Sequence, residues 1–326
     1  MSNLAEQIKK IFPDIKQNIN LSNLSYFNIG GPAEFYLETG NRDLLAQALT
    51  VGDYFKLPIF ILGGGTNILI NDDGVKGLVI KVTLDEIKIS EENVKAEAGV
   101  NFSRLVDKSL KSNLIGLEFA AGLPGTVGGA VRGNAGSFGG QVSDYITQVT
   151  ILKRNESKNW KEVCLDNKQC RFGYRTSIFK ESPGYVIVET EFKLQRGDLM
   201  AASAQAKKNL SYRMEKTDYR QKCAGSFFMN IKGRDFNDFV IKNPKLELPP
   251  EALTRQALAA GWLIEQVGLK GYKLGGAKVS DKHANFLINS GGATASDVIK
   301  LANLIKDEVR NKFQCELREE VELVGF

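Results

Sequence analysis

Two side chains in the middle of the chain could carry out charge and proton chemistry. Arg175 follows Tyr174 within FGYRTSIF, and its planar guanidinium could bind a carboxylate or a phosphate through paired hydrogen bonds. Ser226 follows Gly225 in CAGSFFMN, between a polar segment and an aromatic run, and its hydroxyl could donate a proton to a strongly basic carbanion. Each residue is also typical of an ordinary surface turn, so neither identifies a site alone.

Two neighbouring carboxylates, Glu319 and Glu320, lie in the final segment LREEVELVGF. If this segment is a strand, alternation places them on opposite faces, where neighbouring carboxylates are usually solvated. One face would carry Leu317, Glu319, Val321 and Leu323, and the other Glu320, Glu322 and Val324. Periodicity therefore does not select the glutamate that takes part in chemistry.

The single histidine, His283 in SDKHANFLIN, is expected to be a hydrogen-bonded structural residue at the start of a strand. A Ser–His–Asp hydrolase is not supported, because there is no GxSxG motif and only one histidine. The cysteines have neither the CxxC spacing of a zinc site nor the density of a disulfide framework, so we expect free thiols and no metal. They are Cys164, Cys170, Cys223 and Cys315.

The pentapeptide Gly63–Asn67 reads GGGTN and comes directly after the apolar run PIFIL. Its glycines, threonine and asparagine offer unobstructed backbone N–H groups and two polar side chains, the composition of an anion-binding nest suited to a pyrophosphate. It does not match GxGxxG, because Ile68 occupies the sixth position, and it lacks the GK[ST] of a P-loop. A simple tight turn is the alternative.

A second stretch, Gly116–Gly140, has nine glycines in 25 positions and only two charged residues, Glu118 and Arg132. Glycine lets another group approach bare backbone, but it is unfavourable within regular helices and strands. Apolar residues interleave these glycines, so the stretch is too apolar for a solvated linker. We expect an ordered, buried loop around a planar or anionic ligand, with a self-packed Ω-loop as the alternative. Two such stretches suggest a dinucleotide bound outside the Rossmann pattern.

Hydrophobic patterning predicts the elements that position these residues. The first 82 residues read as a compact α/β opening, with helices at 1–12 and 41–55, the second capped by Asn41, and strands at 33–38, 58–62, 68–70 and 77–82. A strand-rich region follows, with strands at 86–90, 93–99, 146–153 and 185–194 and a helix at 102–112. The last part has helices at 198–216 and 252–268, strands at 283–290 and 317–326, and a closing helix from Thr294, whose capping box includes Asp297.

The composition of the 326 residues, 43% hydrophobic and 25% charged, is that of an ordinary globular protein with two or three domains. The net charge of +5 is small and the lysines are scattered, so we expect no nucleic-acid partner. No run approaches the ~18 apolar residues of a membrane span, and residues 1–12 lack the apolar core of a signal peptide. We therefore expect a cytoplasmic protein with no membrane partner.

In combination, these stretches closely resemble the UDP-N-acetylenolpyruvoylglucosamine reductase family, the flavoenzymes called MurB. Matching segments occur in order across nearly the whole chain. They are FNIGGPAEFYLE, ILGGGTNILINDDGVKGLVI, GLEFAAGLPGTVGGAVRGNAGSFG, CRFGYRTSIFK, AGSFFMN, GWLIEQVGLKGYKLGGAKVSDKHANFLIN and LREEVELVG. The uninterrupted run from YRTSIF into YVIVET is similar to the second, shorter type of the family, which lacks an extra substrate-capping insertion.

The resemblance implies an α+β fold: an FAD-binding fold of the vanillyl-alcohol-oxidase (PCMH) type in two subdomains, and a C-terminal α+β substrate domain. The implied boundaries are 1–83 with the terminal strand 316–326, then 84–197, and 198–315 for the UDP-sugar domain. FAD is expected to be non-covalent, because both glycine-rich stretches lack histidine and cysteine. NADPH is the implied hydride donor, and we expect a monomer.

The family's functional residues fall on matching positions of this chain. The implied catalytic residues are Arg175, Ser226 and Glu320, the last because the family's glutamate precedes a valine. The implied substrate-binding residues are Tyr174, Arg175 and Asn230. The residues implied to contact FAD are Gly63, Gly64, Gly65, Thr66, Asn67, Gly122, Leu123, Pro124, Gly125, Thr126, Gly128, Gly129, Asn134, Ala135 and Gly136.

The implied reaction reduces the enolpyruvyl ether of UDP-N-acetylglucosamine enolpyruvate to UDP-N-acetylmuramate, for peptidoglycan precursor synthesis. Arg175 would supply fixed positive charge to the substrate carboxylate, and Glu320 would donate a hydrogen bond to it if burial raises its pKa. Ser226 would protonate the carbanionic carbon. One departure is Met229, which stands where the family commonly has the lysine of FKNP, so a diphosphate contact from that lysine is missing.

Two other interpretations remain. The chain could be a sugar or alcohol oxidase of the same flavin fold, or a flavin- or nucleotide-binding protein without activity. The joint presence of Arg175, Ser226 and Glu320 argues against the second of these.

Overall fold

Three separate stretches of the chain build each of two units in the computed structural model, which describes residues 4–157, 159–216 and 221–326. The first unit comprises residues 1–19, 33–64 and 75–215, and the second comprises residues 20–32, 65–74 and 216–326. The first three residues of the expected N-terminal helix, and residues 217–220 of the expected third domain, lie outside the described part. The three-domain division and its boundaries stay a prediction.

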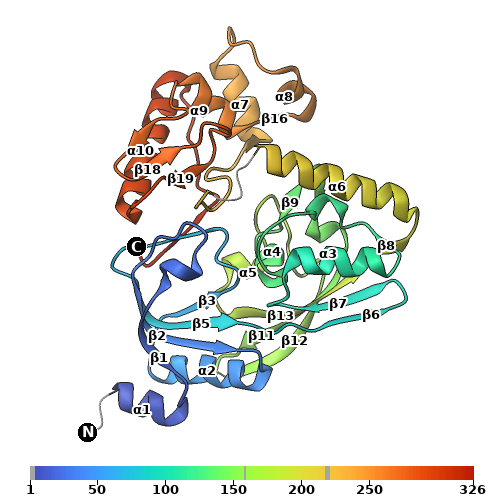
Figure 1. Ribbon diagram of the computed structural model, residues 1–326, viewed down its shortest axis with the longest axis vertical. Coiled ribbons are helices and arrows are strands. Elements are labelled where there is room, and N and C mark those ends of the chain that lie inside the picture. The colour runs from blue at the N-terminus through green and yellow to red at the C-terminus, as the bar shows by residue number, and fades with distance from the viewer. Residues whose placement is uncertain (1–3, 158, 217–220) are drawn as a thin grey trace. The chain divides into compact units, whose positions relative to one another are not determined.

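Alternating apolar segments near the N-terminus produce the first sheet of the first unit (Figure 1). After helix α1 (Leu4–Ile11), its strands have the order β1 (Lys16–Asn20), β2 (Pro32–Thr39), β5 (Val75–Val82) and β3 (Ile59–Leu62). Because β2 and β3 both pair with β5 in parallel, α2 (Arg42–Tyr54) forms the crossover between them. Asn41 caps α2 as predicted, accepting a 2.9 Å hydrogen bond from the Leu44 N–H.

The second sheet of the first unit is antiparallel. Its strands have the order β12 (Trp160–Asp166), β11 (Ile146–Arg154), β13 (Tyr185–Lys193), β7 (Asn93–Glu97) and β6 (Ile87–Ser90). Strand β12 was not predicted. It is an edge strand in which only Leu165 is buried, and its sequence WKEVCLD offers no long apolar run. The same unit contains α3 (Phe102–Lys111), α5 (Ile178–Glu181), α6 (Leu199–Lys216), and the pair β8 (Leu114–Ile115) and β14 (Gln195–Arg196).

The stretch Gly116–Gly140 contains more regular structure than its composition predicts. It forms the 3-10 turn η2 (Glu118–Ala120), the helix α4 (Val127–Arg132) and the strands β9 (Gly136–Ser137) and β10 (Gly140–Gln141), ahead of η3 (Val142–Asp144). The expectation that its glycines disfavour a helix was therefore wrong for Gly128 and Gly129, which lie within α4. Burial of Val127 and Val131 in the core stabilises this helix, since tertiary packing can override weak propensity.

Small sheets and short helices build the second unit (Figure 1). Strand β15 (Ile231–Lys232) pairs with β16 (Ala257–Leu258), and β20 (Glu322–Val324) pairs with β4 (Ile68–Ile70). Strand β18 (Ala277–Val279) pairs with β17 (Lys273–Leu274) on one side and β19 (Leu287–Asn289) on the other. Its helical segments are η1 (Leu21–Leu24), α7 (Arg234–Lys242), α8 (Pro250–Arg255), α9 (Ala260–Gln266) and α10 (Ala295–Phe313). The predicted capping box of Thr294 and Asp297 begins α10. The apolar face of this helix is buried and comprises Val298, Leu301, Ala302, Ile305 and Val309.

The single helix expected over residues 252–268 was wrong. Two helices, α8 and α9, occupy this segment, with strand β16 between them. The break occurs at Gln256, whose φ of 47° ends α8 in the left-handed region. The side chain of Asn230 then accepts a 3.1 Å hydrogen bond from the Ala260 N–H at the start of α9. A long-range contact thus divides a segment that has continuous helical propensity.

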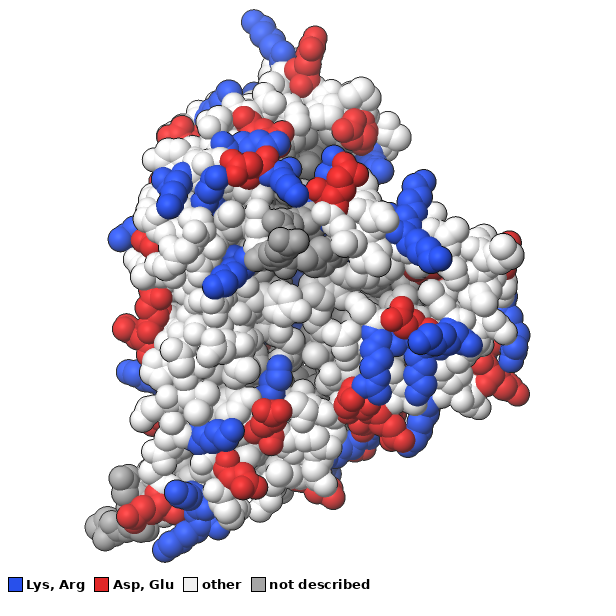
Figure 2. All heavy atoms as spheres, viewed as in Figure 1, with Lys and Arg blue, Asp and Glu red and all other residues white. Residues whose placement is uncertain are grey.

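The charged surface agrees with the scattered pattern of the sequence. Figure 2 shows Lys and Arg side chains interspersed with Asp and Glu side chains over the visible face. No helix within the described residues is both long and apolar enough to cross a membrane.

Candidate functional site

The two glycine-rich stretches of the first unit meet through their backbones. A Cβ atom added to Gly64 would lie 2.7 Å from the Cα of Gly125, closer than packed atoms approach. A side chain at Gly64 would therefore push the stretches apart. The two segments predicted to contact FAD are in contact with each other, and part of their glycine content serves that contact.

A half-buried cation supports this meeting point. The ammonium group of Lys81, on β5, donates a hydrogen bond to the carbonyl oxygen of Gly63. Burial lowers the pKa of Lys81, while the nearby carboxylate of Glu38 opposes that change. A positive charge held behind this loop favours an anion on its backbone N–H groups. Sequence reasoning missed Lys81, because the contact joins two strands that are not adjacent in the chain.

The remaining residues of the predicted nest, Gly65, Thr66 and Asn67, belong to the second unit. A Cβ atom at Gly65 would collide with the carbonyl oxygen of Leu24, so backbone packing requires this glycine. The Asn67 side chain donates a 3.0 Å hydrogen bond to the carbonyl oxygen of Glu320. Its amide thus connects the predicted nest to the predicted catalytic glutamate within one unit.

Arg175 lies at the tip of a two-residue turn in the first unit. Gly173 and Thr176 pair as an antiparallel bridge on either side of Tyr174 and Arg175. The φ of Arg175 is 57°, a value that turns usually give to glycine or asparagine, and such strain is concentrated at functional positions. The guanidinium lies 5.7 Å from the centre of the Tyr174 ring, so these predicted substrate-binding residues contact each other.

Two hydrogen bonds attach this turn to the glycine-rich stretch. The Asn134 side chain donates to the Gly173 carbonyl oxygen at 2.9 Å, and the Ser177 hydroxyl donates to the Arg132 carbonyl oxygen at 2.7 Å. The structure therefore brings the predicted catalytic arginine and the predicted FAD-contacting segment Asn134–Gly136 together. Asn134 is only 2% exposed, so its side chain serves these contacts within the protein.

Helix α6 anchors the same stretch at both ends, a role that sequence reasoning missed. Asn209 donates to the carbonyl oxygen of Glu118 at 2.8 Å, and Arg213 donates to that of Ala121 at 3.0 Å. The Arg213 guanidinium also lies 5.0 Å from the centre of the Phe138 ring. Asn209 and Arg213 are four residues apart on one helix face, a spacing that could have marked a polar face with a partner.

The second unit brings Ser226 and Glu320 to neighbouring segments. The Glu320 N–H donates a 2.8 Å hydrogen bond to the carbonyl oxygen of Phe227, directly after Ser226. Ser226 pairs with Phe286 on one side, and Phe228 pairs with Glu319 on the other. The half-buried Ser226 therefore lies in a central segment between two others. This arrangement could place a hydroxyl and a carboxyl beside one bound substrate.

The two adjacent glutamates differ in their surroundings. The carboxylate of Glu319 forms a 2.8 Å ion pair with Lys306 of α10. The strict alternation expected over residues 317–324 was wrong, because Leu323 is 39% exposed while Val324 is buried. Regular strand pairing begins only at Glu322, and the N–H groups of Glu320 and Val321 both point at the Phe227 carbonyl oxygen. The ion pair accounts for the Glu319 carboxylate, while the backbone of Glu320 bonds to Phe227, directly after Ser226.

The remaining predicted residues have simple settings. Asn230 is exposed, and its side-chain oxygen accepts from the Ala260 N–H at the start of α9. His283 is not in a strand as expected, since β19 begins at Leu287. Its Nδ1 accepts a 3.3 Å hydrogen bond from the Asn285 N–H, and burial lowers its pKa. The expected structural role of His283 agrees with these contacts.

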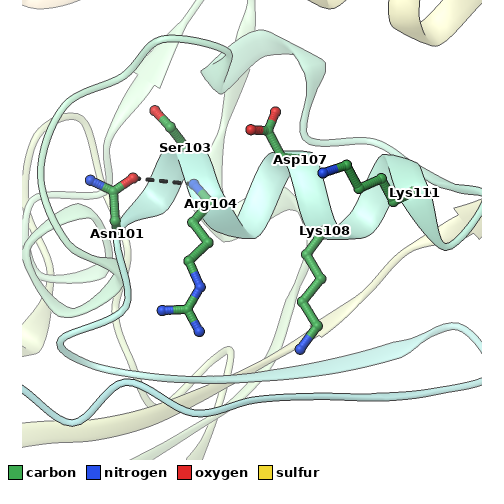
Figure 3. A pocket seen from close by; sticks show the side chains of 6 residues that line it. All are labelled: Asn101, Ser103, Arg104, Asp107, Lys108 and Lys111. Carbon is green, nitrogen blue, oxygen red and sulfur yellow. Dashed lines mark hydrogen bonds between the residues drawn. The ribbon is translucent and has the colours of Figure 1, made fainter.

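A surface depression of about 480 Å³ lies over α3, and none of the predicted site residues lines it (Figure 3). Its basic groups already have protein partners: Arg104 pairs with Asp85, and Lys108 donates to the Ile87 carbonyl oxygen at 2.9 Å. The depression is lined by Asn101, Ser103, Arg104, Asp107, Lys108 and Lys111. None of these residues was predicted to be functional. Among the described residues, no group of three potential protein ligands could hold a metal ion.

Comparison with known proteins identifies the family. Residues 33–157 match the FAD binding domain family, and residues 217–324 match the C-terminal domain of UDP-N-acetylenolpyruvoylglucosamine reductase. The chain is 35% identical to the UDP-N-acetylenolpyruvoylglucosamine reductase of Anoxybacillus flavithermus, over 95% of this chain and 94% of that protein. The chain belongs to the UDP-N-acetylenolpyruvoylglucosamine reductase family.

Other members of the UDP-N-acetylenolpyruvoylglucosamine reductase family support this assignment. The Bacillus subtilis enzyme is 34% identical, over 98% of this chain and 99% of that protein. The crystal structure of the Thermus caldophilus enzyme, MurB, aligns with a TM-score of 0.72 at 27% identity, over 95% of this chain and 99% of that chain. The predicted α+β fold, with an FAD-binding part and a C-terminal domain, is confirmed.

The residues of the first unit fit the FAD that its matched domain binds. Two bare backbone stretches meet at Gly64 and Gly125, and the half-buried Lys81 ammonium bonds to the Gly63 carbonyl oxygen beside them. This combination suits a pyrophosphate and a flat ring system. Since neither Gly63–Asn67 nor Gly116–Gly140 contains histidine or cysteine, these stretches have no side chain for a covalent flavin link.

Proposed function

We propose that this chain is an FAD-containing, NADPH-dependent UDP-N-acetylmuramate dehydrogenase, which reduces UDP-N-acetylglucosamine enolpyruvate to UDP-N-acetylmuramate. The family assignment over 95% of the chain supports this reaction. The chemistry that FAD supplies when bound is transfer of a hydride from NADPH to the methylene carbon of the enolpyruvyl group. The protein must then stabilise negative charge on the substrate and protonate the adjacent carbon.

The proposed catalytic residues divide this work. Arg175 holds the substrate carboxylate, into which the carbanion spreads its charge, and its fixed positive charge stabilises the resulting enolate. Ser226 transfers its hydroxyl proton to the carbanionic carbon. Glu320, when protonated, would donate a hydrogen bond to the substrate carboxylate. Solvent returns a proton to Ser226 after each turnover.

Tyr174, Arg175 and Asn230 are the proposed substrate-binding residues. The proposed FAD contacts comprise Gly63–Asn67, Gly122–Thr126, Gly128, Gly129 and Asn134–Gly136. The segment Asn134–Gly136 would contribute backbone groups. The single observation that carries the proposal is the pairing of the Phe227 carbonyl with the Glu320 N–H at 2.8 Å. This bond places a hydroxyl donor and a carboxyl group on adjacent segments of the domain that matches the family.

The test is a spectroscopic separation of the two half-reactions. The purified protein should be yellow, NADPH should bleach its flavin absorbance, and the enolpyruvyl UDP-sugar should restore that absorbance under anaerobic conditions. Rapid reoxidation by oxygen, with no response to the UDP-sugar, would assign the chain to the sugar or alcohol oxidases. A colourless protein that does not take up FAD would contradict both assignments and favour a protein without flavin chemistry.

The cellular setting is part of the same proposal. We propose that the protein lies in the cytoplasm, because NADPH and UDP-sugars are both supplied in that compartment. We also propose that it is a monomer. Its product would enter peptidoglycan precursor synthesis, and hence cell wall biogenesis, cell shape and cell division. Fractionation of cells, and sedimentation of the purified protein, test the location and the oligomeric state.

A further inference from the structure

Four hydrogen bonds of 2.9 Å or less, made to only two residues, hold the backbone polar groups of the two aromatic residues after Ser226, and a longer 3.4 Å bond from the Val321 N–H also reaches the Phe227 carbonyl oxygen. The Phe227 N–H donates to the Asn285 carbonyl oxygen at 2.7 Å, and the Phe227 carbonyl accepts from the Glu320 N–H at 2.8 Å. The Phe228 N–H donates to Asn285 Oδ1 at 2.9 Å, and the Phe228 carbonyl accepts from Asn285 Nδ2 at 2.8 Å. Asn285 therefore supplies three of these bonds and Glu320 supplies the fourth.

Asn285 is well suited to hold this segment rigidly. It is only 2% exposed, and its own N–H donates to Nδ1 of His283. Helix α9 packs closely beside it, since a Cβ atom on Gly261 would lie 3.5 Å from the Asn285 Cβ. Buried amide groups strongly favour conformations in which every donor and acceptor is paired. The Asn285 side chain thus has one favourable arrangement, and that arrangement fixes Phe228.

The chain on the other side of Ser226 provides less constraint. Gly225 has a φ of 76°, and no atom lies within 4 Å of the position where its Cβ would be. Glycine gives this link a wide range of backbone conformations. The position of the Ser226 hydroxyl is therefore set mainly from its C-terminal side, through Phe227 and Phe228.

We propose that Asn285 is a positioning residue that holds the Ser226 hydroxyl and the Glu320 carboxyl in one fixed arrangement. The inference rests on the proposed function, in which Ser226 donates a proton and Glu320 binds the substrate carboxylate. Asn285 acts through the backbone of Phe227 and Phe228 and takes no proton itself. Substitution of Asn285 should therefore slow the step that needs aligned proton transfer and leave flavin reduction unchanged.

Asn285→Asp is the most direct test, because it preserves the shape of the side chain. The aspartate lacks the Nδ2 donor and turns an oxygen toward the Phe228 carbonyl, so the segment must shift. Since a misplacement of about 1 Å can cost about 10²-fold in rate, we expect reoxidation by the enolpyruvyl UDP-sugar to slow about 10- to 100-fold. Reduction by NADPH should keep its rate, and the solvent deuterium isotope effect on reoxidation should increase.

Asn289→Asp provides the matched control. Asn289 lies on β19, and its amide donates to the Phe27 carbonyl oxygen and accepts from the N–H groups of Gly291 and Ala293. It makes the same kind of side-chain contact as Asn285 but does not bond to residues 226–228. Its variant should lower thermal stability and leave both half-reactions and the isotope effect near those of the unaltered protein.

A double variant decides whether Asn285 acts through Ser226. In a Ser226→Ala background, Asn285→Asp should slow reoxidation by a smaller factor than in the unaltered protein, because the proton donor is already absent and only the alignment of Glu320 is left to lose. Equal slowing with and without Ser226, or equal slowing of both half-reactions, would overturn the proposal. If Asn285→Asp does not fold, Asn285→Ser, which keeps one hydrogen-bonding group, takes its place in the same measurements.

Amide hydrogen exchange tests the positional claim without any turnover. The amides of Phe227, Phe228 and Glu320 should exchange faster in Asn285→Asp than in Asn289→Asp, even if the unaltered protein does not reduce the UDP-sugar. Unchanged protection at all three amides would contradict the inference and leave the proposed function untouched. Loss of substrate-dependent reoxidation in the unaltered protein would contradict the proposed function alone.

Discussion

The glycine-rich stretch of the first unit and the Ser226 segment of the second unit fix their functional groups by different means. In the first, bare backbones meet at Gly64 and Gly125, and the stretch is held by Asn209 and Arg213 of α6. In the second, one serine depends on a buried asparagine more than 50 residues away. A ligand surface made of backbone tolerates few side chains, whereas a reactive side chain depends on the residues that hold its neighbours.

This difference predicts where substitutions act. Changes in the glycine-rich stretch should impair the binding of FAD and the stability of the first unit. Changes around Ser226 should spare FAD binding and slow the reaction of the sugar substrate. Ser226, Glu320 and Gly64 are each compared with a residue of the same type that lacks their contacts.

The largest effect is expected for Ser226→Ala. Removal of a general acid typically costs about 10²–10⁴-fold, so reoxidation by the enolpyruvyl UDP-sugar should slow by that factor. Reduction by NADPH should proceed normally, which stopped-flow absorbance measures directly. Ser290→Ala, in the same unit, removes a hydroxyl that donates to the Gly276 carbonyl and should leave both rates unchanged. Normal sugar reduction in Ser226→Ala would exclude this serine from the mechanism.

The adjacent glutamates give the next comparison. Glu320→Ala should slow reoxidation by about 10²–10³-fold, the usual cost of losing one donor to a developing oxyanion. Glu319→Ala removes only the partly exposed ion pair with Lys306, worth up to about 1 kcal/mol of stability, and should change the rate less than 3-fold. Steady-state kcat for the two variants distinguishes them. If Glu319→Ala were the slower variant, the choice between the carboxylates would be reversed.

Gly64→Ala tests the backbone contact in the first unit. The added methyl group would lie 2.7 Å from the Gly125 Cα, and overpacking of this kind costs about 1–3 kcal/mol. We expect weaker FAD binding, measured by titration of the flavin-free protein, and a lower melting temperature. Gly133→Ala is the control, since its Cβ would meet only the Gly129 carbonyl oxygen at 3.6 Å. Equal FAD affinity in the two variants would show that the contact does not shape the cofactor site.

The smallest effect concerns pH and His283. Burial lowers the pKa of His283, so its neutral form is favoured in the folded state and protonation favours unfolding. Its contribution to stability is present above the ordinary histidine pKa of about 6.5 and is lost as the pH falls below that value. Because this is the only histidine, the slope of melting temperature between pH 6.5 and 5 reports on it. His283→Asn should flatten that slope, and an unchanged slope would contradict this assignment.

Much of the fold was predictable because local signals agreed with tertiary structure. The apolar runs before Gly63 and around Val79 became parallel strands, and Asn41 and Thr294 cap helices as their sequence contexts indicate. The failures have a common cause. Strand β12 lies at a sheet edge without an apolar run, and the helix expected over residues 252–268 is interrupted where β16 pairs with β15. Pairing with distant residues decided both cases.

The candidate site likewise contains residues that the sequence marked and residues that only the structure revealed. Glycine density marked Gly63–Asn67 and Gly116–Gly140, since composition alone reveals where backbone must remain uncovered. Lys81 and Asn285 left no such signal in the sequence. A lysine within a strand and an asparagine shortly before a strand are both common. Periodicity did not separate Glu319 from Glu320, and only the family motif, in which the glutamate precedes a valine, indicated Glu320.

The discontinuous course of the chain has a consequence for its synthesis on the ribosome. Strand β4 is entirely buried and apolar, and it pairs in parallel with β20, whose Glu322 aligns with Ile68. The residues of β4 therefore leave the ribosome long before their partner strand exists. This short hydrophobic strand therefore stays unpaired until residues 322–324 have left the ribosome, and the second unit cannot complete its fold before then.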